Sequence, residues 1–289
     1  MTSPAIDNHE SLEELLLLIL EKLEGKEYEL PALPQVATQV LGLTMDPDAH
    51  AAQLTTVIQQ DPVLTSKIFQ VANSAALGPQ RKIESLQQAV AWLGLNNVAG
   101  SAFSLSVQSG VFNVSGYERE VKGLWTHALA TGFYGKVIAS KLGLNPDTAF
   151  LCGLLHAIGK PFVVHTVNQY RPPSAAPLPW SAMMTLMNES YIEVGRQLGE
   201  AWNYPFPVKE AINLHEDHSY HLVTCPTKGG VITCLARHLA SNFVDPEAIP
   251  EETLLALPVV QALRLTEEEM TTLLQSQETI QAQVETMLL

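Results

Sequence analysis

Hydrophobic residues recur every three to four positions along almost the whole chain, and the alternation typical of β-strands is essentially absent. In the stretch AHAAQLTTVIQQ, Leu54, Val57 and Ile58 fall on one face of a helix. The next segment places Leu64 and Ile68 in the same way. The pattern predicts an all-α protein of about a dozen helices, with no internal repeat and no low-complexity tract.

Local signals place the ends of these helices. Asp61 is suited to an N-cap and Pro62 to the first helical position, while Ser85 and Gln88 form a capping box. At another helix end, Asn73 can bond orphan carbonyls or adopt the left-handed conformation. Further starts are expected at Asn96, at Asn145-Pro146 and at Thr266 with Glu269, and stops at Gly25, Gly94 and Gly143. The predicted helices cover approximately residues 10–24, 35–43, 51–60, 62–72, 86–93, 96–107, 118–142, 146–160, 181–202, 206–217, 227–243 and 267–289, with a proline-rich loop over 172–179.

Composition describes a folded protein with ample core. The 289 residues are 46% hydrophobic and 16% charged, enough for one large domain or two modest ones. The formal net charge is −14, without a cluster of Lys and Arg. Such a charge repels phosphate backbones and acidic membranes, so we expect no nucleic-acid partner and no membrane association.

Cysteine usage and hydropathy favour a cytoplasmic protein. The chain has three cysteines, Cys152, Cys225 and Cys234, an odd number without a C-x-x-C pair. This pattern is typical of reduced thiols rather than of a disulfide framework or a zinc ribbon. The apolar run LLLLIL at 15–20 is too short to span a membrane, and no basic region precedes it as in a signal peptide.

Two sets of short motifs carry a family resemblance. The first set is LP at 33–34, VIQQDP at 57–62, VANSAAL at 71–77 and IESLQQAVAWLG at 83–94. The second set is LWTHALAT at 124–131, GLLHAIGK at 153–160, ESYIEVGRQLGEAWNYP at 189–205, EAINLHE at 210–216 and LARHLA at 235–240. In this order the two sets resemble the two halves of the HDOD family, a bacterial signalling module whose second half is a degenerate HD-type domain. The resemblance covers about residues 28–243.

The resemblance implies a multi-helix HD-domain-like fold in which an N-terminal helical subdomain packs on an HD-type helical core. We divide the chain accordingly into an N-terminal acidic helix (1–27), an HDOD-type helical half (28–115), a degenerate HD-type half (116–243) and a C-terminal helical extension (244–289). We expect a stand-alone module, because only short helices flank the two halves and no receiver, kinase or cyclase segment is recognisable.

The same resemblance locates a vestigial metal site. In an active HD-type phosphohydrolase an early His, an adjacent His-Asp pair and a later Asp hold one or two divalent metals. Here the early His matches His127 and the paired His matches His156, but alanine replaces the paired Asp. The later Asp position matches Arg237. The implied pocket consists of His127, His156, Ala157, Lys160, Tyr191, His215 and Arg237.

Electrostatics argues against a metal in this pocket. Two carboxylates are lost and a cation is gained. An arginine about 5 Å from a divalent ion is repelled by roughly 7 kcal/mol at an effective dielectric constant of about 20. Ala157 alone removes the ligand that bridges the metals. We therefore expect no metal, no cofactor and no hydrolase activity.

Other histidines and cysteines have simpler interpretations beside functional ones. His215, His218 and His221 could cap the end of a helix at the surface or form an adventitious metal site. We expect His127 and His156 to be buried and hydrogen-bonded to each other or to backbone, with a residual ligand pocket as the alternative. Cys152 lies one turn before His156, but its apolar neighbours indicate a buried, inert thiol.

Three functions follow from these observations. The first is a non-catalytic regulatory module in signal transduction that binds a protein partner. The second is a divergent metal-dependent phosphohydrolase acting on nucleotides or a cyclic dinucleotide. It would use His127, His156 and His215, with Glu189 or Glu216 as the substitute carboxylate. The third is a structural subunit that forms homo-oligomers through its first helix or its final helix.

Overall fold

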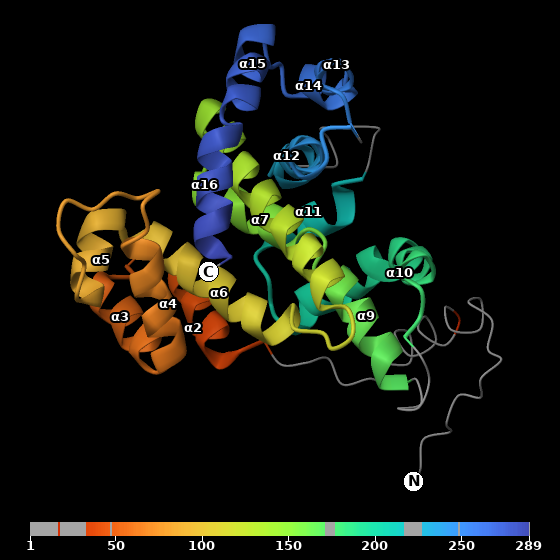
Figure 1. The fold of residues 1–289 in the computed structure, drawn as a ribbon. Coiled ribbons are helices and arrows are strands. Elements are labelled where there is room, and N and C mark those ends of the chain that lie inside the picture. Colours follow the sequence, from red (N-terminus) through yellow and green to blue (C-terminus); the bar gives the residue numbers. More distant parts are fainter. Residues whose placement is uncertain are drawn as a thin grey trace.

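The protein is described here by a computed structural model. It describes Leu17 and residues 33–46, 48–170, 177–216, 227–247 and 249–288. In these ranges every regular element is a helix, from α2 to α16, which confirms the predicted all-α fold (Figure 1). The predicted helix over 10–24 and most of the loop over 172–179 lie outside the described residues, as do His218, His221 and Cys225.

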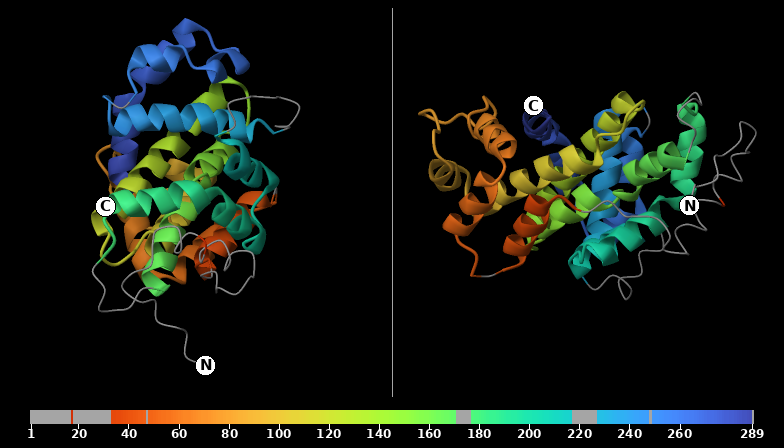
Figure 2. Two further views of the ribbon diagram at one scale, coloured as in Figure 1. Left: turned by 90° about the vertical axis from the view of Figure 1, so that its right-hand side faces the viewer. Right: turned by 90° about the horizontal axis from the view of Figure 1, so that it is seen from below.

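Helices α2 to α6 form a compact N-terminal group. They are α2 (Gln35–Met45), α3 (Ala51–Gln59), α4 (Pro62–Ala72), α5 (Leu86–Leu93) and α6 (Leu95–Val111). Helices α2 to α5 gather at one end of the molecule, and the longer α6 leads from them toward the remaining helices (Figures 1 and 2).

The second group is built around α7, the longest helix. It comprises α7 (Glu118–Lys141), α8 (Pro146–Leu155), α9 (Gly159–Tyr170), α10 (Trp180–Ala201), α11 (Phe206–Leu214) and α12 (Gly229–Val244). Helices α8 and α12 pack on α7, and α9 and α10 pack on each other at the end of the molecule opposite α2 to α5 (Figure 2). The boundary predicted between residues 115 and 116 lies between α6 and α7.

The C-terminal helices connect the two groups. They are α13 (Glu251–Leu255), α14 (Pro258–Ala262), α15 (Glu267–Gln275) and α16 (Gln277–Met287). Helix α16 packs on α7 and also on α4 and α6, while α6 contacts α8 directly. The N-terminal subdomain therefore packs on the HD-type core as predicted, with α16 against both (Figure 1).

Most predicted helix starts are confirmed at atomic detail. The Asp61 carboxylate accepts hydrogen bonds from the first-turn amides of α4, and Ser85 with Gln88 forms the predicted capping box of α5. The capping box of Thr266 with Glu269 opens α15. Asn73 uses its side chain, not a left-handed backbone: its amide donates to the carbonyl oxygens of Phe69 and Ile83 and accepts from the Ile83 N–H.

Other predicted boundaries are wrong. Asn96 does not cap α6, because Gly94 occupies the N-cap position and the Asn96 amide donates to Asp147 instead. The segment 146–160 is not one helix: residues 156–158 form a turn between α8 and α9. The final predicted helix is broken at Ser276 into α15 and α16. The helix predicted over 206–217 ends at Leu214, and α13 and α14 were not predicted.

The stretch Pro146–Gln169 is long and apolar enough to cross a membrane by composition, yet 83% of its most apolar window is buried within the protein. This is the behaviour of a core helix.

The burial follows from close packing, because α8 and α9 contact their neighbours through glycines. A Cβ on Gly153 would lie 2.5 Å from the Thr131 carbonyl oxygen on α7. A Cβ on Gly159 would lie 2.0 Å from the Tyr191 carbonyl oxygen on α10.

These contacts predict a sharp difference between two glycine substitutions. Gly159→Ala forces a methyl group into the backbone of α10, which cannot move aside as a flexible side chain can. We expect it to lower the free energy of unfolding by about 3 kcal/mol or more. Gly123→Ala is the matched control, because nothing lies within 4 Å of its Cβ position in α7. Alanine there should stabilise the helix by about 0.5–1 kcal/mol. Urea denaturation of both variants measures the difference, and equal effects would contradict the assigned α9–α10 contact.

Candidate functional site: a buried histidine cluster

Three histidines from separate parts of the HD-type half meet in the core. His127 lies on α7, His156 follows the last residue of α8, and His215 follows the last residue of α11. The ring centroids of His127 and His156 are 5.8 Å apart, and those of His156 and His215 are 4.9 Å apart. The structure thus brings together the three histidines that the sequence singled out.

Each imidazole is hydrogen-bonded within the protein. His156 Nδ1 lies 2.7 Å from the Gly153 carbonyl oxygen, and His215 Nδ1 lies 2.9 Å from that of Ala211. Because a carbonyl only accepts, both Nδ1 atoms carry the proton. The Nε2 atom of His215 then accepts a 2.9 Å hydrogen bond from the Tyr191 hydroxyl. His156 bonds to backbone as predicted.

His127 is held from α12, by the Ser241 side chain and by a hydrogen bond with the Arg237 backbone that favours its protonated form. Its Nε2 lies 3.1 Å from the Ser241 hydroxyl oxygen on α12. The Ser241 hydroxyl donates to the Arg237 carbonyl oxygen one turn earlier, so the imidazole is the donor to Ser241. Two of the three Nε2 atoms, those of His127 and His215, are therefore already engaged.

Burial keeps the cluster neutral. His156 and His215 are 3% and 1% exposed. Desolvation lowers the pKa of His215 to about 4, and it lowers the pKa of His156 well below its ordinary value, with the charges of His215 and His127 acting in the same direction. Desolvation and the Lys160 charge lower the pKa of the partly buried His127 to about 4. At neutral pH the three rings are uncharged.

Two cations flank the neutral rings. The Arg237 Nε donates to the His215 carbonyl oxygen at 3.2 Å, and the Arg237 guanidinium lies 3.9 Å from a Glu216 carboxylate oxygen. The Lys160 ammonium lies 4.6 Å from the centre of the Tyr191 ring. Burial alone would raise the pKa of Glu216, but the nearby Tyr191 hydroxyl and the charge of Arg237 outweigh burial and lower it.

The residues present do not fit a divalent metal. Ala157, in the turn between α8 and α9, offers a methyl group where a bridging carboxylate is needed. The Glu216 carboxylate lies beside Arg237, and Tyr191 occupies the Nε2 of His215. Within the described residues no group of three or more His, Cys, Asp and Glu side chains is arranged to hold a metal ion.

Two site predictions need correction, and a third is confirmed. Glu189 lies inside α10 and is exposed, whereas its neighbours Ser190 and Tyr191 are buried, so it is not the carboxylate of this cluster. His215 does follow the end of a helix, but it is a core residue rather than a surface cap. Cys152 is buried and forms no disulfide, in accordance with its predicted role in the core.

Sequence reasoning missed the roles of two residues. Glu210 is 4% exposed, and its carboxylate accepts hydrogen bonds from the Thr227 hydroxyl and from the Gly229 N–H at the start of α12. Ser241 orients His127, one turn after Arg237 in the same helix. For Glu210 the sequence did carry a signal, because a glutamate stands inside an apolar helix pattern. Nothing in the sequence indicates the role of Ser241, which depends on the folded structure.

The fold and this site define an all-helical protein with HD-like architecture. A solved structure from Shewanella amazonensis SB2B, provisionally named a metal-dependent phosphohydrolase, superposes with a TM-score of 0.70 at 23% identity, over 94% of this chain and 99% of that one. A protein from Marinobacter aquaeolei VT8, provisionally named a signal transduction protein, gives a TM-score of 0.67 at 21% identity, over 98% of this chain and 67% of that one.

The chain belongs to the HDOD family, because the model of the HDOD domain matches residues 30–218, more than half of its length. An uncharacterized protein of Treponema pallidum (strain Nichols) is 26% identical over 235 residues, which cover 78% of this chain and 44% of that protein. This chain therefore spans less than half the length of that relative.

The histidine cluster predicts a loss of stability in mild acid. In the unfolded chain each histidine binds a proton near pH 6.5, whereas His215 does so only near pH 4 in the folded protein. The unfolded state therefore binds more protons between these values, and stability falls as the pH drops below 6.5. Between pH 6.5 and 5.5 the unfolded chain goes from half to mostly protonated at each histidine, so each histidine of the cluster costs about 1 kcal/mol and His127, His156 and His215 together cost roughly 3 kcal/mol.

Urea denaturation at pH 7.5, 6.5 and 5.5 measures this slope. The variant His156→Gln should show about two thirds of the wild-type loss, because one of the three titrating histidines is removed. The control His165→Gln replaces an exposed histidine of α9 and should retain the full slope. A wild-type stability that is flat across this window would mean that the cluster is not desolvated.

Proposed function

We propose that this HDOD protein is a non-catalytic module of signal transduction that acts in the cytoplasm by binding a protein partner. The observation that carries the proposal is the chemistry at the histidine cluster: Ala157 replaces the carboxylate, and Arg237 and Lys160 lie beside the neutral rings. An HD-type phosphohydrolase needs a divalent metal there, and this chain presents positive charge instead.

The internal bonding of the cluster supports the same conclusion. The Tyr191 hydroxyl and the Ser241 hydroxyl occupy the Nε2 atoms of His215 and His127, and Tyr191 is 2% exposed. Such a network is stabilising only when its members remain paired, because an unpaired buried polar group costs about 1–3 kcal/mol. The HD-type half would then serve as a rigid scaffold that supports the surface where the partner binds.

The name of the Marinobacter protein, signal transduction, agrees with this proposal, and the name of the Shewanella protein points to the rival phosphohydrolase. We favour the first because the rival requires metal ligands that the cluster does not supply. The net charge of −14 makes a protein a more suitable partner than a nucleic acid.

The surface offers a candidate contact residue on the N-terminal half. Trp92 of α5 is 47% exposed, although tryptophan is usually well buried in a folded protein. Exposed tryptophans are enriched among the residues that dominate binding at protein interfaces. We therefore place the partner contact at α5, at the end of the molecule remote from α9 and α10 (Figure 1).

Quantitative affinity capture tests the proposal. The tagged protein is cross-linked in its native cells, and captured proteins are quantified by mass spectrometry against the tag alone. We expect at least one partner enriched by wild type, with at least tenfold less captured by Trp92→Ala, equivalent to about 1.4 kcal/mol of binding energy. The control Gln87→Ala changes an exposed residue of the same helix and should capture the wild-type amount. Capture of the protein itself alone would overturn the proposal, and equal capture by all three proteins would exclude α5 as the contact.

A further inference from the structure

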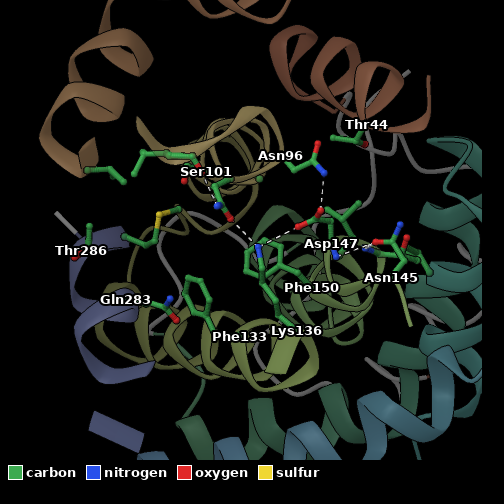
Figure 3. A pocket seen from close by; sticks show the side chains of 18 of the residues that line it. Thr44, Asn96, Ser101, Phe133, Lys136, Asn145, Asp147, Phe150, Gln283 and Thr286 are labelled. Atoms are coloured by element: carbon green, nitrogen blue, oxygen red, sulfur yellow. Dashed lines mark hydrogen bonds and ion pairs between the residues drawn. The ribbon is translucent and has the colours of Figure 1, made fainter. Parts of the chain in front are cut away.

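A cavity lies where the two halves of the protein and the C-terminal helix meet. Its volume is about 260 Å³. Its lining includes Ser101 of α6, Phe133 of α7, Phe150 of α8 and Gln283 of α16 (Figure 3). This volume is close to the lower end of the range for small-molecule pockets, roughly 300–1,000 Å³. The cavity is separate from the histidine cluster, none of whose residues lines it.

The cavity has an aromatic wall and a polar edge. The rings of Phe133 and Phe150 pack on each other with centroids 5.2 Å apart. At the polar edge, the Lys136 ammonium donates to Asp147 at 3.0 Å and to Asn97 at 2.7 Å, and the Asn96 amide donates to Asp147 at 2.7 Å (Figure 3). An apolar wall with a few convergent polar groups is the usual composition of a small-molecule site.

The charge of the lining is balanced. Lys136 and Asp147 are the charged side chains among the described residues around the cavity, and they form an ion pair. An anionic ligand would meet a lysine that is already neutralised and a carboxylate beside it. The cavity therefore suits an uncharged molecule, because burying an unpaired charge is costly.

Hydrogen-bonding capacity is left over inside the cavity. Among the described residues, the Ser101 hydroxyl and the Gln283 side-chain amide lie in the lining without a protein hydrogen-bond partner. They lie on α6 and on α16, so they approach a ligand from different elements. These groups can orient one polar substituent of a bound molecule.

We propose that this cavity binds an uncharged, ring-containing small molecule that carries one or two hydrogen-bonding groups. The rings of Phe133 and Phe150 pack against the apolar part, and Ser101, Gln283 and the Lys136–Asp147 pair bind the polar part. The inference goes beyond the proposed function and does not depend on it. A ligand in this position contacts the N-terminal half, the HD-type half and α16 together, so binding stabilises their packing.

N-phenyl-1-naphthylamine, an uncharged aromatic amine whose fluorescence rises in apolar sites, tests the proposal on the full-length protein. We expect saturable binding of one probe per chain and a rise in melting temperature with probe concentration. The variant Ser101→Leu fills the cavity and should weaken binding at least tenfold. The control Ser109→Leu makes the same change at an exposed position of the same helix and should bind as wild type does. Absence of saturable binding to wild type, or equal binding by both variants, would overturn the proposal.

Two further measurements keep the test decisive. If Ser101→Leu fails to fold, Gly100→Ala takes its place, since its new Cβ would lie 3.7 Å from the Phe150 ring, an ordinary contact distance. This variant should weaken binding at least threefold. The sulfonated analogue 8-anilinonaphthalene-1-sulfonate has a similar ring system with a negative charge, and it should bind at least tenfold more weakly. Equal affinity for the two probes would overturn the assignment of an uncharged ligand.

Discussion

The close approach of helix backbones at glycine positions is the constraint on which the HD-type half depends. Gly153 lets α8 rest on the backbone of α7 at Thr131 and Gly132, and Gly159 lets α9 rest on α10 at Tyr191. The turn at residues 156–158 lies between these two contacts. The two glycines therefore set the position of His156 between His127 and His215, because a side chain at either glycine would collide with the neighbouring helix.

Once the three imidazoles are packed together, desolvation determines their charge. Water cannot reach His156 and His215, so the protonated forms are disfavoured and hydrogen bonds inside the protein take the place of solvent. An active HD-type site would need carboxylates to balance its metal. This site has Arg237 and Lys160 around neutral rings, and the Glu216 carboxylate is compensated by Arg237. The described residues around the rings therefore carry a net positive charge, which opposes a divalent ion and is the physical basis of the proposal that the protein acts through its surface.

Features encoded in a few neighbouring residues could be predicted from the sequence. The caps at Asp61, Ser85 and Thr266 are local hydrogen bonds between residues two or three apart, and all three are confirmed. The resemblance of the ordered motifs identified the family and the histidines that meet. Features set by tertiary contacts were missed. The turn that breaks the 146–160 segment is followed directly by the contact of Gly159 with α10, and the buried His215 is hydrogen-bonded to Tyr191 of α10. The cavity at the junction needs three elements far apart in the chain, so no local pattern could reveal it.

The central claim is that the histidine cluster is complete without a metal, and bound metal measures it most directly. The protein is purified without chelator from cells supplied with manganese, iron and zinc, and the metal content per chain is determined by plasma mass spectrometry. The double variant Ala157→Asp/Arg237→Asp, which returns two carboxylates to the site, is measured in parallel. The account predicts a metal content near zero for the wild-type protein and a clear gain for the double variant. One or two tightly held ions per wild-type chain would contradict it and would make phosphohydrolase activity the leading explanation of the site.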